Sequence, residues 1–210
     1  MKQNKTEVIF VLDRSGSMDS IKTDMEGGIA TLIEKQKLEK GECLVTLYQF
    51  DNKFDKVFET KPIKDINEKI VIVPRGGTAL FDAVGRAINE VGERLSNTLE
   101  SERPESVIFI CITDGEENSS AEFTNTQIKE MIRKQETQFS WKFIYLGANQ
   151  DAFSAGKNYG FAAGTSVTYR GTKAGINNTF RNLSNKLSQV RACSSADLSY
   201  SVAEREAQEE

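Results

Sequence analysis

The segment from Val8 to Met18 reads VIFVLDRSGSM and decides the fold. Its first five residues are an unbroken apolar run, which is typical of a parallel strand buried on both faces. A helical pattern follows from about residue 20, so Asp13, Ser15 and Ser17 lie where a strand ends and a helix begins. Ligands of open α/β sheets bind at that edge. One carboxylate and two hydroxyls are hard oxygen donors of low total charge, and they suit Mg²⁺ or Mn²⁺.

The composition is that of a globular chain without a nucleic-acid footprint. The 210 residues suffice for one α/β domain, and 38% of them are hydrophobic and 28% charged. The net charge of −4 gives no basic surface for nucleic acid. Residues 1–7 are polar and lack a signal-peptide core, and the longest apolar run, residues 107–112, is too short to span a membrane. We therefore expect neither a nucleic-acid nor a membrane partner.

The histidine and cysteine content limits the kinds of catalysis and metal binding that the chain can support. The chain contains no histidine, which excludes Ser-His-Asp and Cys-His catalysis and any histidine-ligated zinc. Its three cysteines, Cys43, Cys111 and Cys193, lie far apart and form no Cys-x-x-Cys pair, so we expect no thiolate zinc site. Cysteines of this kind fit a reduced, cytoplasmic setting. Any metal must therefore be held by oxygen.

Alternating apolar patterns predict the fold class. Strands are expected at 8–12, 44–50, 54–59, 107–112, 141–146 and 166–169, and helices at 20–38, 79–99, 125–136, 152–159 and 173–190. The turn residues Asp51, Asn52 and Lys53 join two of these strands as an antiparallel hairpin. The pattern thus predicts an α/β fold: a doubly wound, mostly parallel six-stranded sheet with one antiparallel edge strand and helices on both faces.

The domain organisation follows from the same pattern. We expect residues 1–192 to form one domain, because no internal repeat or second domain is evident. Residues 201–210 carry four Glu and one Arg, which is typical of a solvated segment. Residues 193–210 are therefore expected to form an acidic, flexible tail.

Two further polar residues occupy positions equivalent to those of the first motif. Thr78 follows Gly76 and Gly77 just before a predicted helix, and Asp114 comes directly after a predicted central strand. The carboxyl ends of neighbouring parallel strands meet at one edge of a sheet. Thr78 and Asp114 are therefore expected to converge with Asp13, Ser15 and Ser17 on one point.

The combined pattern resembles the von Willebrand factor A domain and its metal-ion-dependent adhesion site. In that family the site is Asp-x-Ser-x-Ser, followed by a distant Thr and a distant Asp, and every position is present here without substitution. The resemblance covers roughly residues 6–192 and implies the doubly wound fold. The metal-site residues that it implies are Asp13, Ser15, Ser17, Thr78 and Asp114.

The resemblance also implies a role for each site residue. Ser15 and Ser17 would ligate the cation through their hydroxyls, and Thr78 would ligate directly in one state and through water in another. Asp13 and Asp114 would hold waters or the serine hydroxyls. The sixth coordination position would take a carboxylate from a partner protein. Mg²⁺ is the expected ion, with Mn²⁺ and Ca²⁺ as alternatives.

Shorter stretches are similar to stand-alone bacterial and phage members of the family. They are Ser17-Met18, residues 77–82 (GTALFD) and residues 146–152 (LGANQDA). This similarity implies an intracellular protein that works beside an operon-encoded ATPase or another intracellular protein. Four residues near the ligand positions are candidates for contact with the partner: Arg14, Arg75, Gly77 and Glu116. For the three charged residues, a solvated surface role is the alternative.

Three classes of function remain open. The first is a metal-dependent protein-interaction module that is not an enzyme. The second is a Mg²⁺-dependent hydrolase or phosphotransferase using Asp13 or Asp114, and the third is a structural subunit with a filled metal site. The chain has no phosphate-binding loop, and Ser15 stands where an aspartyl-phosphate phosphatase has its second Asp. With no clear general base either, the sequence favours the first class.

Overall fold

The computed structural model describes residues 1–149 and 151–209. Gln150, which belongs to the stretch 146–152 quoted above, lies outside the described residues. A single six-stranded sheet runs through the protein, with the strands in the order β3-β2-β1-β4-β5-β6. The strands are β1 (Lys2–Asp13), β2 (Glu42–Phe50), β3 (Phe54–Pro62), β4 (Pro104–Thr113), β5 (Lys142–Ala148) and β6 (Ser166–Tyr169).

All neighbouring strands pair in parallel except β3, which is antiparallel to β2 at one edge. The chain adds strands on one side of β1, then crosses over and builds outward on the other side from β4. The strand order therefore reverses between β1 and β4, and ligands of open α/β sheets bind at the carboxyl ends of the strands at such a point. The predicted fold class, including the antiparallel edge strand, is confirmed.

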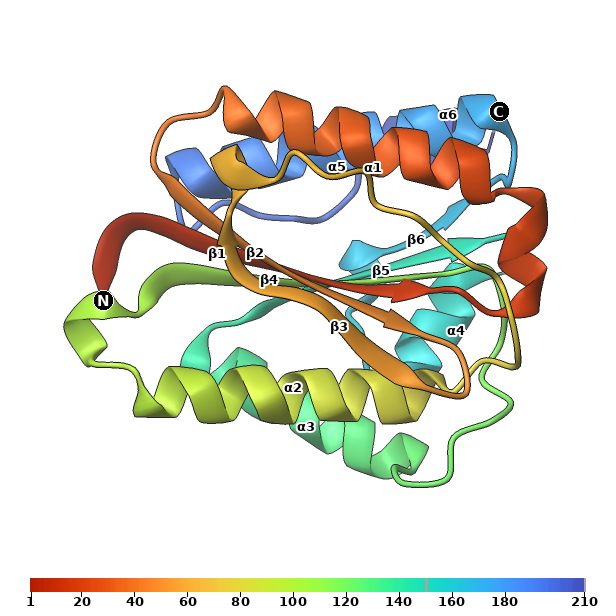
Figure 1. The fold of residues 1–210 in the computed structure, drawn as a ribbon, viewed down its shortest axis with the longest axis horizontal. Coiled ribbons are helices and arrows are strands. Elements are labelled where there is room, and N and C mark those ends of the chain that lie inside the picture. The colour runs from red at the N-terminus through yellow and green to blue at the C-terminus, as the bar shows by residue number, and fades with distance from the viewer. Residues whose placement is uncertain (150, 210) are drawn as a thin grey trace.

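Helices cover both faces of the sheet (Figure 1). One face carries α1 (Lys22–Lys37) and α5 (Lys173–Ala192), and the short α6 (Val202–Gln208) lies beside α5. The opposite face carries α2 (Leu80–Asn97), α3 (Asn125–Phe139) and α4 (Ala152–Tyr159). No helix in the described part of the chain combines the length and hydrophobicity that crossing a membrane requires.

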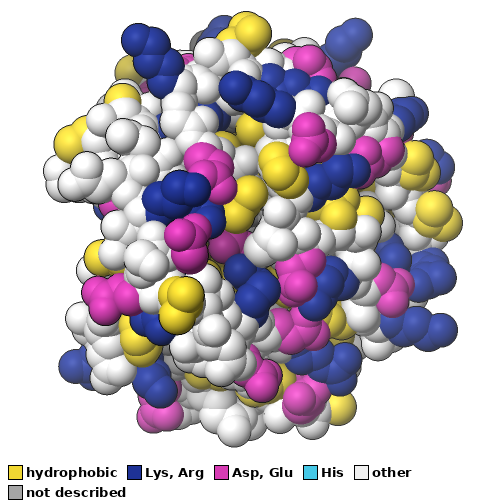
Figure 2. Space-filling view, turned by 60° about the vertical axis from the view of Figure 1, so that its left-hand side comes forward, with side chains coloured by type: hydrophobic (Ala, Val, Ile, Leu, Met, Phe, Trp, Pro, Cys, Tyr) yellow, Lys and Arg dark blue, Asp and Glu magenta, His cyan; other side chains and the backbone are white. Residues whose placement is uncertain are grey.

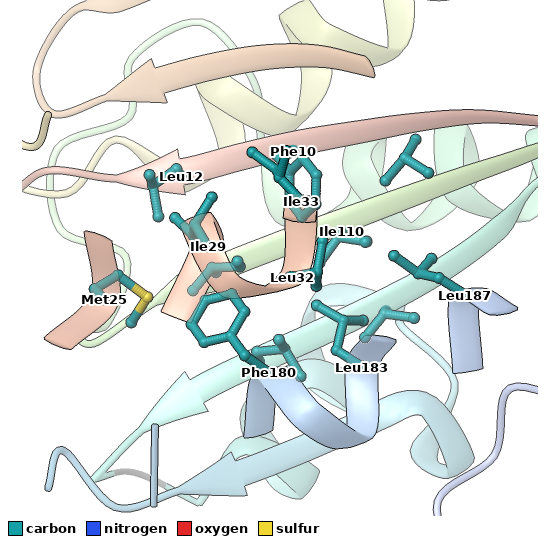
Figure 3. Packing of buried hydrophobic residues seen from close by; sticks show 14 of the residues in the cluster. Phe10, Leu12, Met25, Ile29, Leu32, Ile33, Ile110, Phe180, Leu183 and Leu187 are labelled. Carbon is teal, nitrogen blue, oxygen red and sulfur yellow. The ribbon is translucent and has the colours of Figure 1, made fainter. Parts of the chain in front are cut away.

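The central strand β1 supplies side chains to two hydrophobic cores. Val8, Phe10 and Leu12 belong to the core under α1 and α5, whereas Ile9 and Val11 belong to the core under α2 and α3. Burial on both faces explains why the strand reads as a continuous apolar run rather than an alternating one. In Figure 3, Phe10 and Leu12 face the packed side chains of α1 and α5, which include Ile29, Leu32, Phe180 and Leu183.

Close packing of α1 on α5 depends on one glycine. A Cβ atom added at Gly28 would lie 2.2 Å from the ring of Phe180. The small residue lets the aromatic ring lie against the helix backbone. Interiors are packed densely enough that an added methyl group at such a place forces a shift.

The beginning of the first helix differs from the prediction. The predicted helix at 20–38 is preceded in the structure by a 3₁₀ turn, Gly16–Ser20, and the α-helix begins at Lys22. The backbone N–H of Met18 donates to the carbonyl of Ser15 in this turn, and the side chain of Met18 is fully buried. The turn thus brings the chain from the end of β1 over the core before the helix can begin.

The expectation of a flexible tail after residue 192 is wrong. Leu198 and Tyr200 are buried in the core under α5, and a capping box between Ser201 and Glu204 begins α6. The Arg205 guanidinium donates to the backbone carbonyls of residues 163, 164 and 166, which anchors α6 at the start of β6. The acidic composition was misleading because a few apolar and hydrogen-bonding side chains are enough to hold this segment in place.

Opposite charges are mixed on the surface face seen in Figure 2. Lys and Arg side chains there alternate with Asp and Glu, and hydrophobic side chains are scattered among them. That mixture fits the small net charge of −4 and gives this face no basic stripe.

Candidate metal centre

The predicted site residues lie together at the carboxyl edge of the sheet. Asp13 is the last residue of β1, Asp114 directly follows β4, and Thr78 lies two residues before α2. Because β1 and β4 are adjacent parallel strands, their ends bring the two aspartates to the point where the strand order reverses. The sheet topology therefore assembles polar groups that are far apart in the sequence.

Asp13 is fully buried and makes two short hydrogen bonds. Its Oδ1 accepts from the backbone N–H of Ser15 at 2.6 Å, and its Oδ2 accepts from the Thr113 hydroxyl at 2.6 Å. Burial raises the pKa of Asp13 to about 6 even though these hydrogen bonds oppose the shift, and the nearby Asp114 raises it slightly further. A cation placed nearby would favour the ionised form. Asp13 thus fixes the serine loop and supplies a negative charge beneath it.

The two serine hydroxyls form a pair that is tied to Asp114. Ser15 Oγ lies 3.1 Å from Ser17 Oγ, and Ser17 Oγ donates to Asp114 Oδ1 at 2.6 Å. Burial raises the pKa of Asp114, and the hydrogen bond from Ser17 opposes that shift. Oxygen ligands at right angles on Mg²⁺, each at 2.0–2.1 Å, are separated by about 2.9–3.0 Å. The spacing of the two hydroxyls therefore suits adjacent positions on such an ion.

Thr78 presents its hydroxyl to the same place. Its backbone N–H donates to Asn118 Oδ1 at 2.9 Å, and the Asn118 N–H donates back to the Thr78 carbonyl at 3.1 Å. The Thr78 hydroxyl itself makes no hydrogen bond to the residues that the structure describes. A Cβ atom built at Gly115 would lie 3.3 Å from Thr78 Oγ1 and 3.6 Å from Ser17 Oγ. Both hydroxyls thus face the same small space beside Gly115.

These groups fit a hard divalent cation better than any softer metal. The donors are hydroxyl and carboxylate oxygens, which suit Mg²⁺, Mn²⁺ or Ca²⁺. Within residues 1–149 and 151–209, no group of three or more His, Cys, Asp or Glu side chains could hold a metal. A cation at this edge would therefore depend on the neutral hydroxyls as well as on the aspartates.

Two acidic residues hold the loop 115–124 against the start of α2. Glu117 accepts hydrogen bonds from the backbone N–H of Phe81 and from the loop itself, at Ser119 and Ser120. Asp82 accepts from the backbone N–H groups of residues 121, 122 and 123. Neither Asp82 nor Glu117 is among the predicted site residues. The contacts that join this loop to α2 link residues that lie 36–41 positions apart, so no local sequence signal could reveal them.

Asn118 and Thr113 were missed altogether as supports of the site. Asn118 binds the backbone of Thr78, and Thr113 binds Asp13. Thr113 could have been suspected, because it immediately precedes Asp114 at the strand end. Asn118 lies in a polar loop, and the sequence does not distinguish it from its polar neighbours as a contact of Thr78.

The predicted partner-contact residues have different environments. Arg14 was predicted to contact the partner, with a solvated surface role as the alternative, but its side chain is buried and pairs with Asp51 and Asp55. Arg75 is half-exposed, and Glu116 is exposed at the rim of the site. The backbone N–H of Gly77 is bound to Asn52 Oδ1 at 2.6 Å. Arg75 and Glu116 therefore remain accessible to a partner, whereas Arg14 is committed to the interior.

A hollow of about 680 Å³ lies at the other end of the sheet, away from these residues. It is lined by the C-terminal halves of α2 and α3, with Trp141 among its lining residues. The candidate metal centre lies instead at the carboxyl edge of the sheet, where Ser17 is exposed and Asp13, Ser15 and Thr78 are buried.

Comparison with known proteins identifies the architecture. A family model described as von Willebrand factor type A domain matches residues 7–190. No curated protein matches the chain in sequence. Solved structures with a similar fold also match, and the three described next are 12–17% identical to this chain.

Three of these structures serve as examples. Proximal thread matrix protein 1 from the mussel byssus, with a zinc-occupied MIDAS motif, gives a TM-score of 0.64 at 16% identity, covering 90% of this chain and 47% of that one. A von Willebrand factor type A protein from Catenulispora acidiphila gives 0.56 at 17% identity, covering 89% and 43%. A D319A mutant of the PilB minor pilin from Streptococcus sanguinis gives 0.61 at 12% identity, covering 94% and 64%. The chain spans about half the length of the first two, and at these identities the likeness shows the fold alone.

Proposed function

The chain belongs to the von Willebrand factor type A family, and from that premise we propose that it is a metal-dependent protein-interaction module and not an enzyme. Domains of this family are generally protein-interaction modules. The proposal adds that a divalent cation at the carboxyl edge of the sheet binds an Asp or Glu side chain of a partner protein.

The arrangement of hydroxyls carries this proposal. Ser15 and Ser17 lie 3.1 Å apart, and the Thr78 hydroxyl faces the space beside them without another partner among the described residues. These three would hold the cation, while Asp13 and Asp114 orient the serine loop and supply negative charge. The five residues would together form a complete metal-ion-dependent adhesion site.

The donor set explains why a partner's carboxylate would bind strongly. Ligation mainly by neutral hydroxyls leaves much of the cation's charge uncompensated, so that it attracts an external anion. The near-octahedral preference of Mg²⁺ adds a directional requirement to that attraction. The bound cation would supply one electrostatic contact of fixed geometry at this edge of the sheet.

The ion itself is proposed to be Mg²⁺, with Mn²⁺ or Ca²⁺ as alternatives. The related mussel structure has zinc in its MIDAS motif, so zinc belongs in any comparison of ions. Oxygen donors without His or Cys favour the harder ions here.

The partner is proposed to be an intracellular protein that presents a carboxylate, such as an operon-encoded ATPase. A cytoplasmic location agrees with three unpaired cysteines, of which Cys43 and Cys111 are buried. The similarity to stand-alone bacterial and phage members supports the same proposal, and neither nucleic acid nor a membrane is proposed as a partner.

Thermal unfolding tests whether the site binds a cation. At a hundredfold excess over its dissociation constant, a ligand stabilises a folded protein by about 2.7 kcal/mol. For a chain of this size, that amounts to a rise of roughly 5–10 °C in melting temperature. We expect this rise with MgCl₂ relative to EDTA for the wild type and none for a Ser15→Ala/Ser17→Ala double variant.

A matched control and a binding experiment complete the test. A Ser96→Ala/Ser101→Ala variant removes two exposed hydroxyls far from the site and should respond to Mg²⁺ like the wild type. Partner capture from host lysate should require Mg²⁺ and be lost with the Ser15/Ser17 variant. Identical melting curves of the wild type in EDTA and Mg²⁺ would contradict the proposal, and capture insensitive to EDTA would favour a structural subunit.

A further inference from the structure

A buried carboxylate next to the candidate metal centre has no part in the donor set described above. Asp51 directly follows β2, at the start of the turn to β3, and only 2% of its surface is exposed. Its Oδ2 accepts from Arg14 Nε at 2.8 Å and from Arg75 Nε at 2.7 Å. Its Oδ1 accepts from the backbone N–H of Lys53 at 2.6 Å. One carboxylate thus receives two guanidinium groups and a backbone donor.

The two arginines belong to the two loops that carry the hydroxyl donors. Arg14 stands between Asp13 and Ser15, and Arg75 lies three residues before Thr78. A carboxylate that binds both arginines at once therefore links the serine loop to the threonine loop.

Backbone hydrogen bonds reinforce the same link. The Arg75 N–H donates to the Arg14 carbonyl at 2.9 Å, and the Gly16 N–H donates to the Gly76 carbonyl at 3.2 Å. The Ala79 N–H, next to Thr78, donates to the carbonyl of Asp51 itself at 3.1 Å. Asp51 therefore contacts the threonine loop on both sides of Thr78, through its side chain at Arg75 and its backbone at Ala79.

The charge state of Asp51 is suited to this role. Burial acts to raise the pKa of its carboxyl, but the hydrogen bonds from Arg75, Lys53 and Arg14 outweigh burial and lower it. Asp51 is therefore ionised at neutral pH. Hydrogen bonds between ionised groups are stronger and more directional than neutral ones, so they suit a fixed spacing between loops.

We propose that Asp51 is a positioning residue, which sets the distance of Thr78 from Ser15 and Ser17 and thereby the affinity for the cation. This inference rests on the proposed cation site. Without the Asp51 carboxylate, the two guanidinium groups keep only the exposed Asp55 as a shared counter-charge, and the threonine loop moves away from the serine loop. The ion then keeps the serine hydroxyls and loses Thr78.

Asp55 provides the matched control. Its carboxylate contacts the same two arginines, with Arg75 at 3.5 Å, but its side chain is 53% exposed and it lies at the outside of the cluster. Among the described residues, Asp55 makes no hydrogen bond to the backbone of either ligand loop. Asp55→Asn should therefore leave metal binding within about twofold of the wild type, since exposed ion pairs contribute little.

The experiment measures Mn²⁺ binding to the full chain by the electron paramagnetic resonance signal of free Mn²⁺. Asp51→Asn is expected to weaken binding on the order of tenfold, as supporting residues of metal sites often do. The same change in a Thr78→Ala background should cost less than about twofold, because the loop then has no ligand to position. A merely structural role would give equal losses in both backgrounds.

Arg75→Gln tests the same link if Asp51→Asn does not fold. Arg75 is half-exposed, and its loss leaves Asp51 paired with Arg14. Weaker Mn²⁺ binding that disappears in the Thr78→Ala background supports the proposal. Wild-type affinity in Asp51→Asn or Arg75→Gln, or equal losses with and without Thr78, overturns it while leaving the cation site standing. Absence of Mn²⁺ binding by the wild type overturns the cation site and this inference together.

Discussion

Replacing Asp13 with Asn is expected to stabilise the metal-free protein while abolishing its response to metal. Asp13 is fully buried, and burial raises its pKa from the ordinary 3.8 to about 6. The folded state therefore prefers the neutral carboxyl, and at pH 7.5 the ionised form is held at a cost. Asn has nearly the same shape and no charge, so it removes that cost.

The structure also lets Asn keep the hydrogen bonds. The amide oxygen can accept from the Ser15 N–H, as Asp13 Oδ1 does. The amide N–H₂ can donate to Thr113 Oγ1, whose own hydroxyl hydrogen then turns to the Gly115 carbonyl at 3.1 Å. No buried donor or acceptor loses its partner, so the change in charge dominates the effect.

The magnitude follows from the pKa. A rise from 3.8 to about 6 corresponds to roughly 3 kcal/mol, because a tenfold change in an equilibrium constant is about 1.4 kcal/mol. We take this as an upper bound, since the loop relaxes. For a chain of 210 residues, a gain of about 1–3 kcal/mol raises the melting temperature by roughly 2–12 °C.

Thermal unfolding followed by circular dichroism in EDTA checks this at several pH values. The raised pKa stabilises the fold below about pH 4, and that stabilisation is lost as the pH rises through about 6. The advantage of Asp13→Asn over the wild type should therefore be largest above pH 7 and vanish near pH 4. Asp19→Asn, at an exposed position in the following turn, should change stability by less than about 0.5 kcal/mol. A variant less stable than the wild type at pH 7.5, or a difference independent of pH, would refute the reasoning.

Three further predictions concern metal affinity and packing. Mg²⁺ affinity should fall as the pH drops below about 6, because a proton on Asp13 competes with the cation, and calorimetric titrations at pH 5 and 7.5 measure this. Leu198→Ala should cost about 2–4 kcal/mol in urea unfolding, since that side chain is buried, whereas Val202→Ala, at an exposed position of the same segment, should cost less than about 0.5 kcal/mol; equal effects would contradict the packed C-terminal segment. Gly28→Ala should cost about 1–3 kcal/mol because its Cβ meets the Phe180 ring, and Phe180→Leu in the same chain should recover part of that loss.

The fold was predictable because its signals are local. The unbroken apolar run of β1 indicated a central strand, and the turn at Asp51 indicated the antiparallel edge hairpin. The predicted ranges 152–159 and 166–169 coincide with α4 and β6. In each case the side chains that decide the conformation lie within the element itself.

The C-terminal segment was not predictable on the same basis. Its stability comes from contacts between Leu198 and Tyr200 and the distant core, and from Arg205 binding backbone carbonyls about 40 positions earlier. From composition alone, such a segment is predicted to be a flexible tail. Only the packed structure reveals where its apolar residues go.

In the candidate site, too, some residues could be predicted from local sequence and others could not. The donors Asp13, Ser15 and Ser17 occupy a short motif at a strand end, so they could be named from the sequence. The burial of Arg14 could not, because it depends on Asp51, which lies 37 positions later. The role of a residue that supports a site depends on partners that are distant in the sequence and that only the fold brings into contact with it.

Isothermal titration calorimetry with MgCl₂ and MnCl₂ tests the central claim most directly. We expect the wild type to bind one divalent cation per chain. Ser15→Ala/Ser17→Ala should bind none while keeping the wild-type circular dichroism spectrum, and Ser96→Ala/Ser101→Ala should bind like the wild type. Binding of equal affinity and stoichiometry in the Ser15/Ser17 variant, or no binding by the wild type, would contradict this claim.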